Sequence, residues 1–570
     1  MVSMSVFASK PWLSSYAPQV PRTIVPPTES LVDMLDASVA RYRRRVALDF
    51  FGGTTTYGEL GDQVARYANA LRKRGVKAGD RVALVLPNCP QHIVAFYAVL
   101  RLGAIVVEHN PLYTERELRH QFEDHEAKVA IVWDKVAASV LDFPGAMGVS
   151  TVISVDVTRA MPLRTRMTLR LPIAKARTAR AALTTGGQVR GAVDWSSLAS
   201  TSPIAASHHR PRLRDTAVLQ YTSGTTGAPK GAILTHANLR ANARQGEAWV
   251  PGMRKGREVV YGVLPMFHAY GLTLCLTFAM SLGARLVLFP KFDEGLVLSA
   301  MRRTPATFLP AVPPIYARLA KAAAARNISL RGIRFAISGA MSLPLSTVEL
   351  WENATDGLLV EGYGMTESSP VVVGNPMGPS RRPGTVGVPF PSTEIRVTDP
   401  ENPAVDLGFN EEGELLVRGP QVFSGYWNRP DETAAVLTRD GWLRTGDIVS
   451  VSEDGFVTIV DRIKEVIITG GFNVAPSEVE HALLSHPSIA DAAVVGVPNA
   501  GGGEDVVAVV VLEDGATLDA EGLREHCRSI LSAYKVPKRF SVVDDLPRSL
   551  IGKVLRRVVR EELIAAGKER

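Results

Sequence analysis

Tyr221-Thr-Ser-Gly-Thr-Thr-Gly-Ala-Pro-Lys-Gly231 is the most informative stretch of this 570-residue chain. It follows an apolar run, Ala217–Gln220, and combines mobile glycines, four hydroxyl residues and one lysine. Glycine lets backbone N–H groups turn towards an anion, hydroxyls donate hydrogen bonds, and Lys230 adds a positive charge. The stretch therefore predicts a loop that holds a polyphosphate, rather than a flexible Ser/Thr/Gly surface loop. Its spacing is not that of a Walker A motif, and Pro229 precedes the lysine.

Strand and helix patterns alternate on both sides of this stretch. Arg81–Leu86 is an apolar strand candidate, Gln91–Leu102 a helix candidate and Ala104–Val107 a further strand. Such alternation predicts parallel α/β layers. The last hundred residues have the pattern of a smaller α+β unit, with strands at Ala492–Val497 and Val506–Val511. We predict an α/β protein with a large N-terminal domain of layered subdomains and a small C-terminal domain.

Eight further segments stand out between residue 264 and residue 553, and two of them carry residue types suited to a nucleotide site. Small glycines flank Tyr363, which would let its ring stack on a flat base, and Glu367 offers the hard oxygen that Mg²⁺ prefers. Asp447 can accept two hydrogen bonds at once. In chain order the segments are Leu264-Pro-Met-Phe-His-Ala-Tyr-Gly271, Ser338-Gly-Ala-Met-Ser-Leu-Pro344, Glu361-Gly-Tyr-Gly-Met-Thr-Glu367, Gly441-Trp-Leu-Arg-Thr-Gly-Asp447, Val460-Asp-Arg-Ile-Lys464, Ile467-Ile-Thr-Gly-Gly-Phe-Asn-Val-Ala-Pro-Ser-Glu478, Ala533-Tyr-Lys-Val-Pro-Lys538 and Pro547-Arg-Ser-Leu-Ile-Gly-Lys553.

In this order the segments resemble those of the adenylate-forming superfamily, which includes acyl-CoA synthetases, beetle luciferases and peptide-synthetase adenylation domains. Val106–Leu118 resembles the corresponding stretch of bacterial long-chain fatty acid–CoA ligases. The resemblance implies an ATP-dependent fatty acid–CoA ligase. Such an enzyme joins a carboxylic acid to AMP, releases pyrophosphate, and transfers the acyl group to coenzyme A.

The resemblance also implies a set of nucleotide-binding and catalytic residues. Lys553, Glu367, Thr225 and His268 would be catalytic, and Thr225 and Glu367 would hold Mg²⁺. Glu361 stands where relatives often carry a neutral residue. The residues expected to bind ATP and AMP are Thr222, Ser223, Gly224, Thr225, Thr226, Gly227, Lys230, Gly339, Ala340, Gly362, Tyr363, Gly364, Met365, Thr366, Asp447 and Arg462.

A domain rotation is a further expectation from the resemblance. Residues 1–461 would form the adenylation domain, 462–464 a hinge that pivots at Lys464, and 465–570 a mobile lid. Ile551 replaces the threonine that many relatives carry before the glycine of the lysine motif. The residues expected to meet coenzyme A after the rotation are Gly470, Gly471, Phe472, Asn473, Lys535 and Lys538.

The acyl pocket is expected to be apolar. Its candidate residues are Met266, His268, Tyr270, Met341 and Met365. No second charged group is evident that would pair with an amino or dicarboxylic substrate, so a medium- or long-chain fatty acid is predicted. The alternatives are a fatty acyl-AMP ligase that loads a carrier protein and a ligase for aryl or dicarboxylic acids. A catalytically silent sensor would be expected to lack Lys553 or Glu367, and both are present.

Residues 157–193 form a basic insertion without a single acidic residue. Read as one helix, Met161–Leu183 would be basic and partly amphipathic, as in helices that lie on anionic membranes. The alternative is a solvated insertion or loop. The basic residues are Arg159, Arg164, Arg166, Arg170, Lys175, Arg177, Arg180 and Arg190.

Composition limits the other possibilities. Hydrophobic residues make up 46% and charged residues 21%, as in globular proteins, and the net charge is +7. Three widely spaced cysteines argue against a disulfide framework and favour the cytoplasm. The uncharged run Val259–Ala284 is interpreted as buried core. The basic excess lacks RNA-binding motifs, so no nucleic-acid partner is expected. The oligomeric state stays open, a homodimer included.

Overall fold

The computed structural model describes residues 5–222, 229–463, 465–469, 472–499, 504–549 and 552–568. The chain divides into two compact units. The large unit comprises Leu13–Thr393 and Arg418–Leu443, and the small unit comprises the residues up to Trp12, Glu394–Val417 and the chain from Arg444 onward. Each unit is described by itself.

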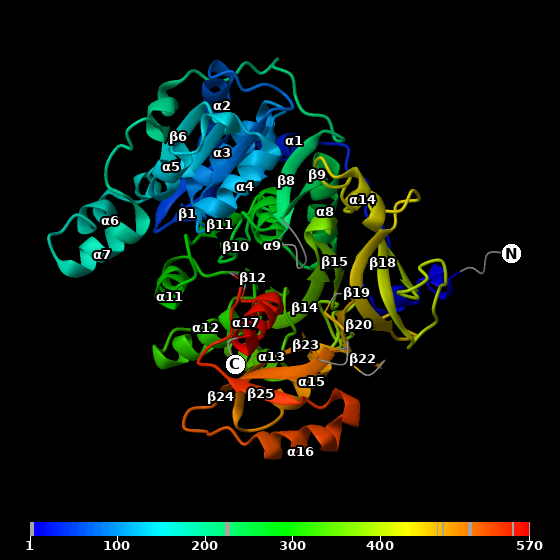
Figure 1. The fold of residues 1–570 in the computed structure, drawn as a ribbon. Helices are drawn as coiled ribbons and strands as arrows, with labels where there is room; N and C mark the ends of the chain where they lie inside the picture. The colour runs from blue at the N-terminus through cyan, green and yellow to red at the C-terminus, as the bar shows by residue number, and fades with distance from the viewer. Residues whose placement is uncertain are drawn as a thin grey trace. The chain divides into compact units, whose positions relative to one another are not determined.

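Two mostly parallel sheets build the large unit (Figure 1). The seven-stranded sheet has the order β7-β6-β5-β3-β4-β8-β9, and the nine-stranded sheet has the order β16-β15-β14-β13-β12-β10-β11-β1-β2. The first sheet contains β3 (Arg81–Val85), β4 (Ile105–Glu108), β5 (Val129–Trp133), β6 (Thr151–Val155), β7 (Val193–Asp194), β8 (Thr216–Thr222) and β9 (Lys230–Thr235). The second contains β1 (Val46–Phe50), β2 (Gly53–Thr56), β10 (Val259–Gly262), β11 (Arg285–Leu288), β12 (Phe308–Ala311), β13 (Phe335–Ser338), β14 (Leu358–Gly364), β15 (Val371–Gly374) and β16 (Val388–Pro389).

Helices connect and cover these strands. All twelve residues of α3 (Pro90–Arg101) are buried, and the helix contacts β1 of one sheet and β3 and β4 of the other. Its apolar side chains pack on every face, while the buried His92 and Arg101 are hydrogen-bonded, to Glu108 and to His209 O. The other helices of the large unit are α1 (Leu31–Tyr42), α2 (Tyr57–Lys73), α4 (Glu115–His125), α5 (Asp134–Leu141), α6 (Leu163–Thr168), α7 (Ala174–Leu183), α8 (His236–Trp249), α9 (Ala269–Gly271), α10 (Phe278–Leu282), α11 (Glu294–Arg303), α12 (Pro313–Ala325), α13 (Leu345–Thr355) and α14 (Pro430–Val436).

The α/β layering predicted from the sequence is confirmed. The predicted strands at Arg81 and Ala104 are β3 and β4, which pair in parallel, and the predicted helix between them is α3. The uncharged run Val259–Ala284 is buried core, formed by β10, α9, the π-helical segment Leu272–Thr277 and α10. Over the described ranges, no helix combines the length and apolar composition that crossing a membrane would need.

The single helix read from Met161 to Leu183 is wrong. The segment forms two short helices, α6 and α7, with a break between them at residues 169–173. Pro172 explains the break, because proline has no N–H to donate and its ring clashes with the preceding turn. The basic residues are thereby distributed over a helical hairpin.

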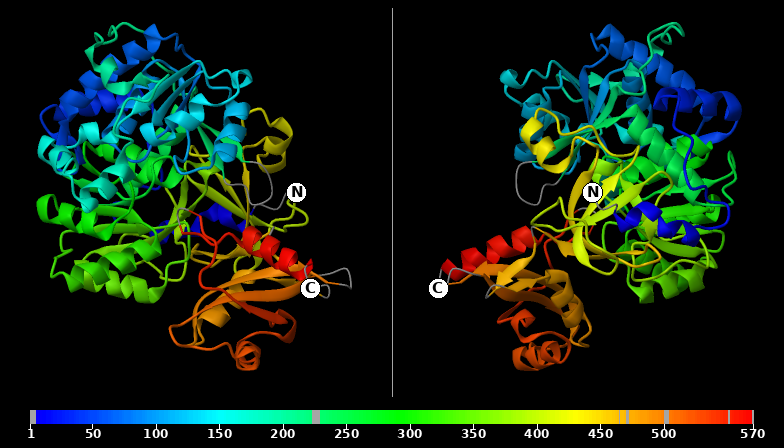
Figure 2. Two further views of the ribbon diagram at one scale, coloured as in Figure 1. Left: turned by 60° about the vertical axis from the view of Figure 1, so that its left-hand side comes forward. Right: turned by 90° about the vertical axis from the view of Figure 1, so that its right-hand side faces the viewer.

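The small unit contains three sheets (Figure 2). Helices cover both faces of its C-terminal sheet. The helices α15 and α16 pack on one face, and Val559 of α17 packs on the other face against Ala493 and Val507. The strands are β17 (Glu394–Thr398), β18 (Glu412–Arg418), β19 (Leu443–Val451) and β20 (Val457–Arg462), then β21 (Ile467–Thr469) with β22 (Phe472–Val474), then β23 (Ile489–Pro498), β24 (Glu504–Leu512) and β25 (Arg539–Val542). The helices are α15 (Pro476–Leu484), α16 (Ala520–Ile530) and α17 (Arg556–Lys568).

The small unit extends beyond the predicted lid, since it also takes in β17 to β20. The predicted boundary at residues 461–465 and the rotation about Lys464, which lies outside the described residues, stay predictions.

A half-buried charge cluster centred on Arg556 joins the two sides of the predicted hinge. The Arg556 guanidinium donates to Glu480 Oε2 over 2.5 Å and to Ser477 Oγ over 2.9 Å. It also pairs with Glu465 and lies 3.8 Å from Asp461. These carboxylates raise the pKa of Arg556 above its usual value, so the side chain stays charged.

Replacing Arg556 by methionine should leave the buried Asp461 and the half-buried Glu465 and Glu480 uncompensated. We expect the small unit to lose about 1–3 kcal/mol of local stability, as measured by amide hydrogen exchange in β23 and β24. Arg557→Met is the matched control, because Arg557 is exposed and pairs only with Glu561 one turn away, a contact worth about 0.3–0.5 kcal/mol. Equal protection in the two variants would contradict a structural role for the cluster.

Candidate active site

The predicted phosphate loop joins two paired strands. β8 ends at Thr222 and β9 begins at Lys230, and these two residues are partners across the antiparallel ladder. The intervening predicted residues, Ser223, Gly224, Thr225, Thr226 and Gly227, lie outside the described residues. Thr222 and Lys230 are thus placed at the base of the loop, at the ends of their strands.

The structure brings Lys230 and Glu367 into one cluster through Tyr426. Lys230 Nζ lies 5.1 Å from the centre of the Tyr426 ring and forms an ion pair with Glu432. The Tyr426 hydroxyl donates to Glu367 Oε1 over 2.7 Å. Burial and the neighbouring Glu367 raise the pKa of Tyr426 above its usual value, so the hydroxyl keeps its proton. A cation and a buried carboxylate therefore stand at the base of the predicted phosphate loop.

Tyr426 and Glu432 were missed at the sequence level. Both belong to a segment that pairs with β9, through a bridge between Ala232 and Tyr426 and a hydrogen bond from Trp427 N to Gly231 O of 2.8 Å. The available signal was the Gly-Tyr-Trp run at 425–427, with aromatic rings next to a glycine in a loop.

The residues predicted to bind adenine and acyl group lie at the carboxyl ends of parallel strands. Gly339 and Ala340 follow β13, and Ala340 has a left-handed φ of 70°. The Tyr270 hydroxyl donates to Ile337 O over 2.7 Å, and a side chain on Gly339 would come within 3.3 Å of the Tyr270 ring. Ligands of parallel α/β sheets bind at this edge.

The predicted Gly362–Thr366 stretch ends β14 and turns away from it. A Cβ on Gly364 would lie 1.9 Å from Pro370 O, so only glycine fits there. Tyr363, Met365 and Thr366 are half-buried. Glu361 is buried, and the loss of solvent raises the pKa of its carboxyl to about 8. At neutral pH the Glu361 carboxyl can therefore keep its proton and remain uncharged.

His268 is held as a neutral side chain. Its Nδ1 accepts a hydrogen bond from Tyr270 N over 3.3 Å, which assigns the proton to Nε2. Exclusion of water lowers the pKa of His268 to about 4. The ring therefore offers one N–H donor, suited to a carboxylate oxygen, and no charge at neutral pH.

This tautomer predicts a specific pH response. His268→Asn should lower kcat/KM for adenylation roughly tenfold, since a hydrogen bond to a charged oxygen is lost. Because the folded-state pKa is depressed, the ring stays neutral from pH 8 down to about 4. The ratio of wild-type to variant kcat/KM should thus stay constant between about pH 5.5 and 8. A ratio that falls roughly tenfold towards pH 5.5 would mean that His268 titrates near its ordinary value.

Two buried amides, also missed at the sequence level, hold the segment that carries His268. Asn88 Nδ2 donates to Leu264 O over 2.7 Å, and Asn88 Oδ1 accepts from Met266 N over 2.8 Å. Gln220, at the end of β8, donates to Phe267 O over 2.5 Å. The segment between the predicted phosphate loop and acyl pocket is thus fixed from both sides. Buried amide side chains occur in many protein cores, so the sequence does not indicate that Asn88 and Gln220 hold this segment.

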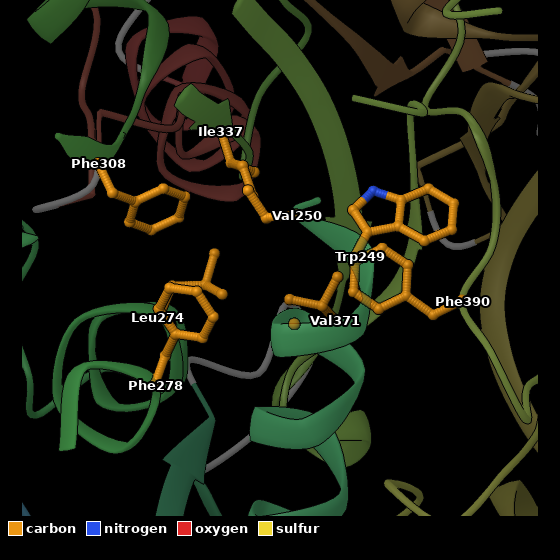
Figure 3. A pocket seen from close by; sticks show the side chains of 9 residues that line it. Trp249, Val250, Leu274, Phe278, Phe308, Ile337, Val371 and Phe390 are labelled. Carbon is orange, nitrogen blue, oxygen red and sulfur yellow. The ribbon is translucent and has the colours of Figure 1, made fainter. Parts of the chain in front are cut away.

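A small apolar cavity of about 10 Å³ lies beside the side chain of Ile337 (Figure 3). Ile337 links this cavity to Tyr270, since its carbonyl accepts a hydrogen bond from the Tyr270 hydroxyl and its side chain lines the cavity. The Trp249 N–H donates to Asn375 O over 3.0 Å, so its indole presents carbon to the space. The lining residues are Gly246, Trp249, Val250, Leu274, Phe278, Phe308, Ile337, Val371 and Phe390. None of the predicted pocket residues Met266, His268, Tyr270, Met341 and Met365 is among them.

In the small unit, two of the residues predicted to bind ATP and AMP are neighbours. Asp447 and Arg462 are partners in the antiparallel pair β19–β20, and Asp447 is 4% exposed. Thr445 Oγ1 accepts from Asp447 N over 3.1 Å. The backbone thus places a carboxylate and an arginine side by side, while the Arg462 side chain lies outside the described residues.

Lys553 stands on a tight turn. Ser549 N donates to Lys553 O over 2.7 Å, and Gly552 N donates to Ser549 O over 2.8 Å. Gly552 has a φ of 81°, which a glycine adopts without strain. The turn fixes the backbone from which the lysine side chain extends.

The residues predicted to bind coenzyme A are distributed over the small unit. Lys535 forms a 2.6 Å ion pair with Glu478, and Lys538 forms one of 2.8 Å with Asp505. Phe472 and Asn473 lie in β22, with their side chains outside the described part. Gly470 and Gly471 lie outside it altogether. β22 contacts the turn Ala533–Lys535, so the structure places Phe472 and Asn473 near Lys535.

Two family models match most of this chain. The AMP-binding enzyme family matches residues 35–427, and the AMP-binding enzyme C-terminal domain matches residues 478–553. The chain belongs to the AMP-binding enzymes. The resemblance to the adenylate-forming superfamily is confirmed.

This AMP-binding enzyme has curated relatives of nearly the same length. It is 40% identical to a long-chain-fatty-acid–CoA ligase of Bacillus subtilis, over 97% of this chain and 98% of the relative. It is 39% identical to the ligase of the same name from Yersinia pestis, over 98% and 99%. A feruloyl-CoA synthase of an Amycolatopsis species is 36% identical over 89% of this chain and 94% of the relative.

Solved structures share the fold of this AMP-binding enzyme. ATP-bound MatB from Rhodopseudomonas palustris has a TM-score of 0.81 at 31% identity, covering 93% of this chain and 98% of that one. A benzoate CoA ligase from Burkholderia xenovorans has a TM-score of 0.78 at 25% identity, covering 93% and 100%. The predicted combination of a large N-terminal α/β domain and a smaller C-terminal domain is confirmed.

Proposed function

We propose that this enzyme is an ATP-dependent fatty acid–CoA ligase. It converts a carboxylate, ATP and coenzyme A into acyl-CoA, AMP and pyrophosphate through an acyl-adenylate. The observation that carries the proposal is the Lys230–Tyr426–Glu367 cluster at the base of the phosphate loop. Nearly full-length similarity to long-chain-fatty-acid–CoA ligases supports it.

In the first step a carboxylate oxygen attacks the α-phosphorus of ATP, and pyrophosphate leaves. Two anions must meet, so the barrier is largely electrostatic. Lys230 would neutralise the polyphosphate and Lys553 the charge shared by the carboxylate and the α-phosphate. His268 would orient the carboxylate through its neutral Nε2–H. Tyr363 would stack on adenine, and Asp447 would accept both ribose hydroxyls.

Glu367 fits the magnesium ion that accompanies ATP. It is a buried carboxylate, and Mg²⁺ takes one or two protein oxygens and completes its shell with phosphate and water. Within the described ranges, no group of three or more His, Cys, Asp or Glu is arranged to hold a metal by itself. This agrees with an ion shared with the nucleotide, held by Glu367 and Thr225. Bound there, Mg²⁺ would offset negative charge on the phosphates.

In the second step the thiolate of coenzyme A attacks the acyl carbonyl, and AMP leaves. Lys553 has no task in this step. We propose that rotation about Lys464 removes it and brings in Gly470, Gly471, Phe472 and Asn473. The Lys535–Glu478 and Lys538–Asp505 pairs would open or rearrange to admit the phosphates of coenzyme A.

A medium- or long-chain fatty acid is the proposed acid. Similarity of 40% and 39% over nearly the full chain to two long-chain-fatty-acid–CoA ligases supports this acid, and the predicted pocket residues Met266, Tyr270, Met341 and Met365 offer no charge to pair with a second polar group. Burial favours a longer chain by about 0.8 kcal/mol per CH₂, until the space is filled.

The test is release of pyrophosphate and AMP with ATP, Mg²⁺ and a series of acids, each with and without coenzyme A. Turnover that rises with chain length and requires coenzyme A is expected. Acyl-AMP that accumulates without a thioester would move the protein to the carrier-loading ligases. Turnover of aryl or dicarboxylic acids alone, in line with the feruloyl-CoA synthase relative, would overturn the fatty acid.

We further propose that the enzyme is cytoplasmic and makes peripheral contact with anionic membranes, where fatty acids partition. The excess of basic residues in 157–193 supports this contact. Recovery with membranes at low salt and release at high salt is expected on cell fractionation.

A further inference from the structure

The hairpin of α6 and α7 exposes large apolar side chains that most proteins would bury. Leu163, Met167, Leu171 and Ile173 are 68%, 61%, 48% and 53% exposed. They account for four of the fifteen exposed large hydrophobic residues of the described chain, within eleven positions. In Figure 1 the hairpin projects from the edge of the large unit, beyond β1 and α5. Clustered exposed apolar residues mark an interaction surface.

The same hairpin carries uncompensated positive charge. No carboxylate of the described residues forms an ion pair with any of its basic side chains, whereas Arg119 and Arg210 elsewhere in the large unit pair with Glu115 and Asp33. The nearest acidic residues in the chain are Asp156 and Asp194. The unpaired basic residues are Arg164, Arg166, Arg170, Lys175, Arg177 and Arg180.

Apolar and basic residues alternate so that both can meet one flat surface. Leu163 and Met167 are four residues apart in α6 and share one side of the helix. Long arginine side chains lie along an apolar surface and extend their charged ends to its polar border. An amphipathic helix at a headgroup layer has this arrangement.

The hairpin is attached firmly at its base. Trp133 Nε1 donates to Leu183 O over 2.8 Å, and Thr184 Oγ1 donates to Asp134 Oδ2 over 2.5 Å. At the other end Met161 is buried. The fold therefore presents the exposed side chains from a fixed stem.

We propose that residues 162–182, the basic hairpin, dock this enzyme on a lipid surface that carries anionic headgroups. The apolar side chains would enter the headgroup layer while the arginines contact lipid phosphates. The inference rests on the membrane contact proposed above and names the surface that makes it. A second copy of the chain lacks the complementary charge on this face, and the absence of acidic residues favours an anionic partner.

The test is co-flotation of the full chain with vesicles of phosphatidylcholine alone or with 30% phosphatidylglycerol, without ATP or acid. Binding only to the anionic vesicles is expected. Leu163→Ser/Met167→Ser/Leu171→Ser/Ile173→Ser should lower the partition coefficient at least tenfold. Each lost basic residue should lower it roughly fivefold, so Arg164→Gln/Arg170→Gln/Arg177→Gln should lower it about a hundredfold. Leu345→Ser/Leu350→Ser in α13 is the matched control, since both residues are exposed leucines of the same unit, and it should bind as wild type does.

Equal binding to neutral and anionic vesicles, or none to either, would overturn the proposal, as would hairpin variants that bind like the control. A wild-type dimer that the apolar variant converts to monomer would assign the surface to a second copy instead. Thermal midpoints of all variants check folding. Acyl-CoA synthesis with soluble octanoate is measured separately. If the wild-type enzyme binds the anionic vesicles but turns over no acid, the proposed function is overturned and the proposed lipid-binding surface is not.

Discussion

Lys553→Ala should lower the rate of acyl-adenylate formation roughly a thousandfold while it leaves the conversion of added acyl-AMP to acyl-CoA within about twofold of wild type. The first step brings two anions together and needs the positive charge, whereas the second step involves a neutral carbonyl. Pyrophosphate exchange measures the first half-reaction, and acyl-CoA formed from synthetic acyl-AMP measures the second.

Two variants make this result interpretable. Arg528→Ala removes an exposed base of the same unit that pairs with Glu521, and both half-reactions should be unchanged. Lys553→Arg keeps the charge on the same turn and should recover part of the adenylation rate. If Lys553→Ala folds normally but loses both half-reactions, Lys553 does not act in adenylation alone. That result would also contradict the proposed domain rotation, which removes Lys553 before the second step.

Glu367→Gln should lower adenylation roughly a hundredfold and raise the Mg²⁺ concentration needed for half-maximal rate. The substitution keeps the shape of the side chain and an oxygen that can accept from Tyr426, but removes the charge that binds the ion. Titration of pyrophosphate exchange with Mg²⁺ at saturating ATP measures the effect.

Tyr426→Phe separates the carboxylate from its hydrogen bond. It removes the 2.7 Å contact with Glu367 Oε1 and leaves the negative charge, so a loss of about tenfold or less is expected. Glu432→Gln releases the ion pair with Lys230 and should leave the Mg²⁺ requirement unaltered. If Glu367→Gln matched Tyr426→Phe in rate and in Mg²⁺ dependence, the carboxylate would serve only to hold Tyr426.

Much of the candidate site was predictable because its residues act through local backbone geometry. The predicted phosphate loop lies between β8 and β9, and Thr222 and Lys230 pair at its base. Gly364 is constrained by Pro370, only six residues away. Asp447 and Arg462 meet because a hairpin aligns them. Short-range constraints of this kind leave residue types at fixed spacing.

Contacts between distant segments were not predictable. Tyr426 reaches Glu367 and Lys230 only because its loop pairs with β9, nearly two hundred residues earlier in the chain. Asn88 and Gln220 hold the His268 segment from two other strand ends. Each is a single polar residue without a periodic partner, so the sequence gives no sign of what it touches.

The sequence by itself determined the α/β class, the order of the motifs and the chemistry they support, since these depend on hydrophobic period and on residue type at fixed spacing. The tertiary structure decided which apolar residues enclose the small cavity beside Ile337, where the basic segment bends, and which of the segment's side chains remain exposed. The reason is physical: burial is a property of what packs against a residue, and in a chain of this length most of those neighbours come from segments far away in sequence.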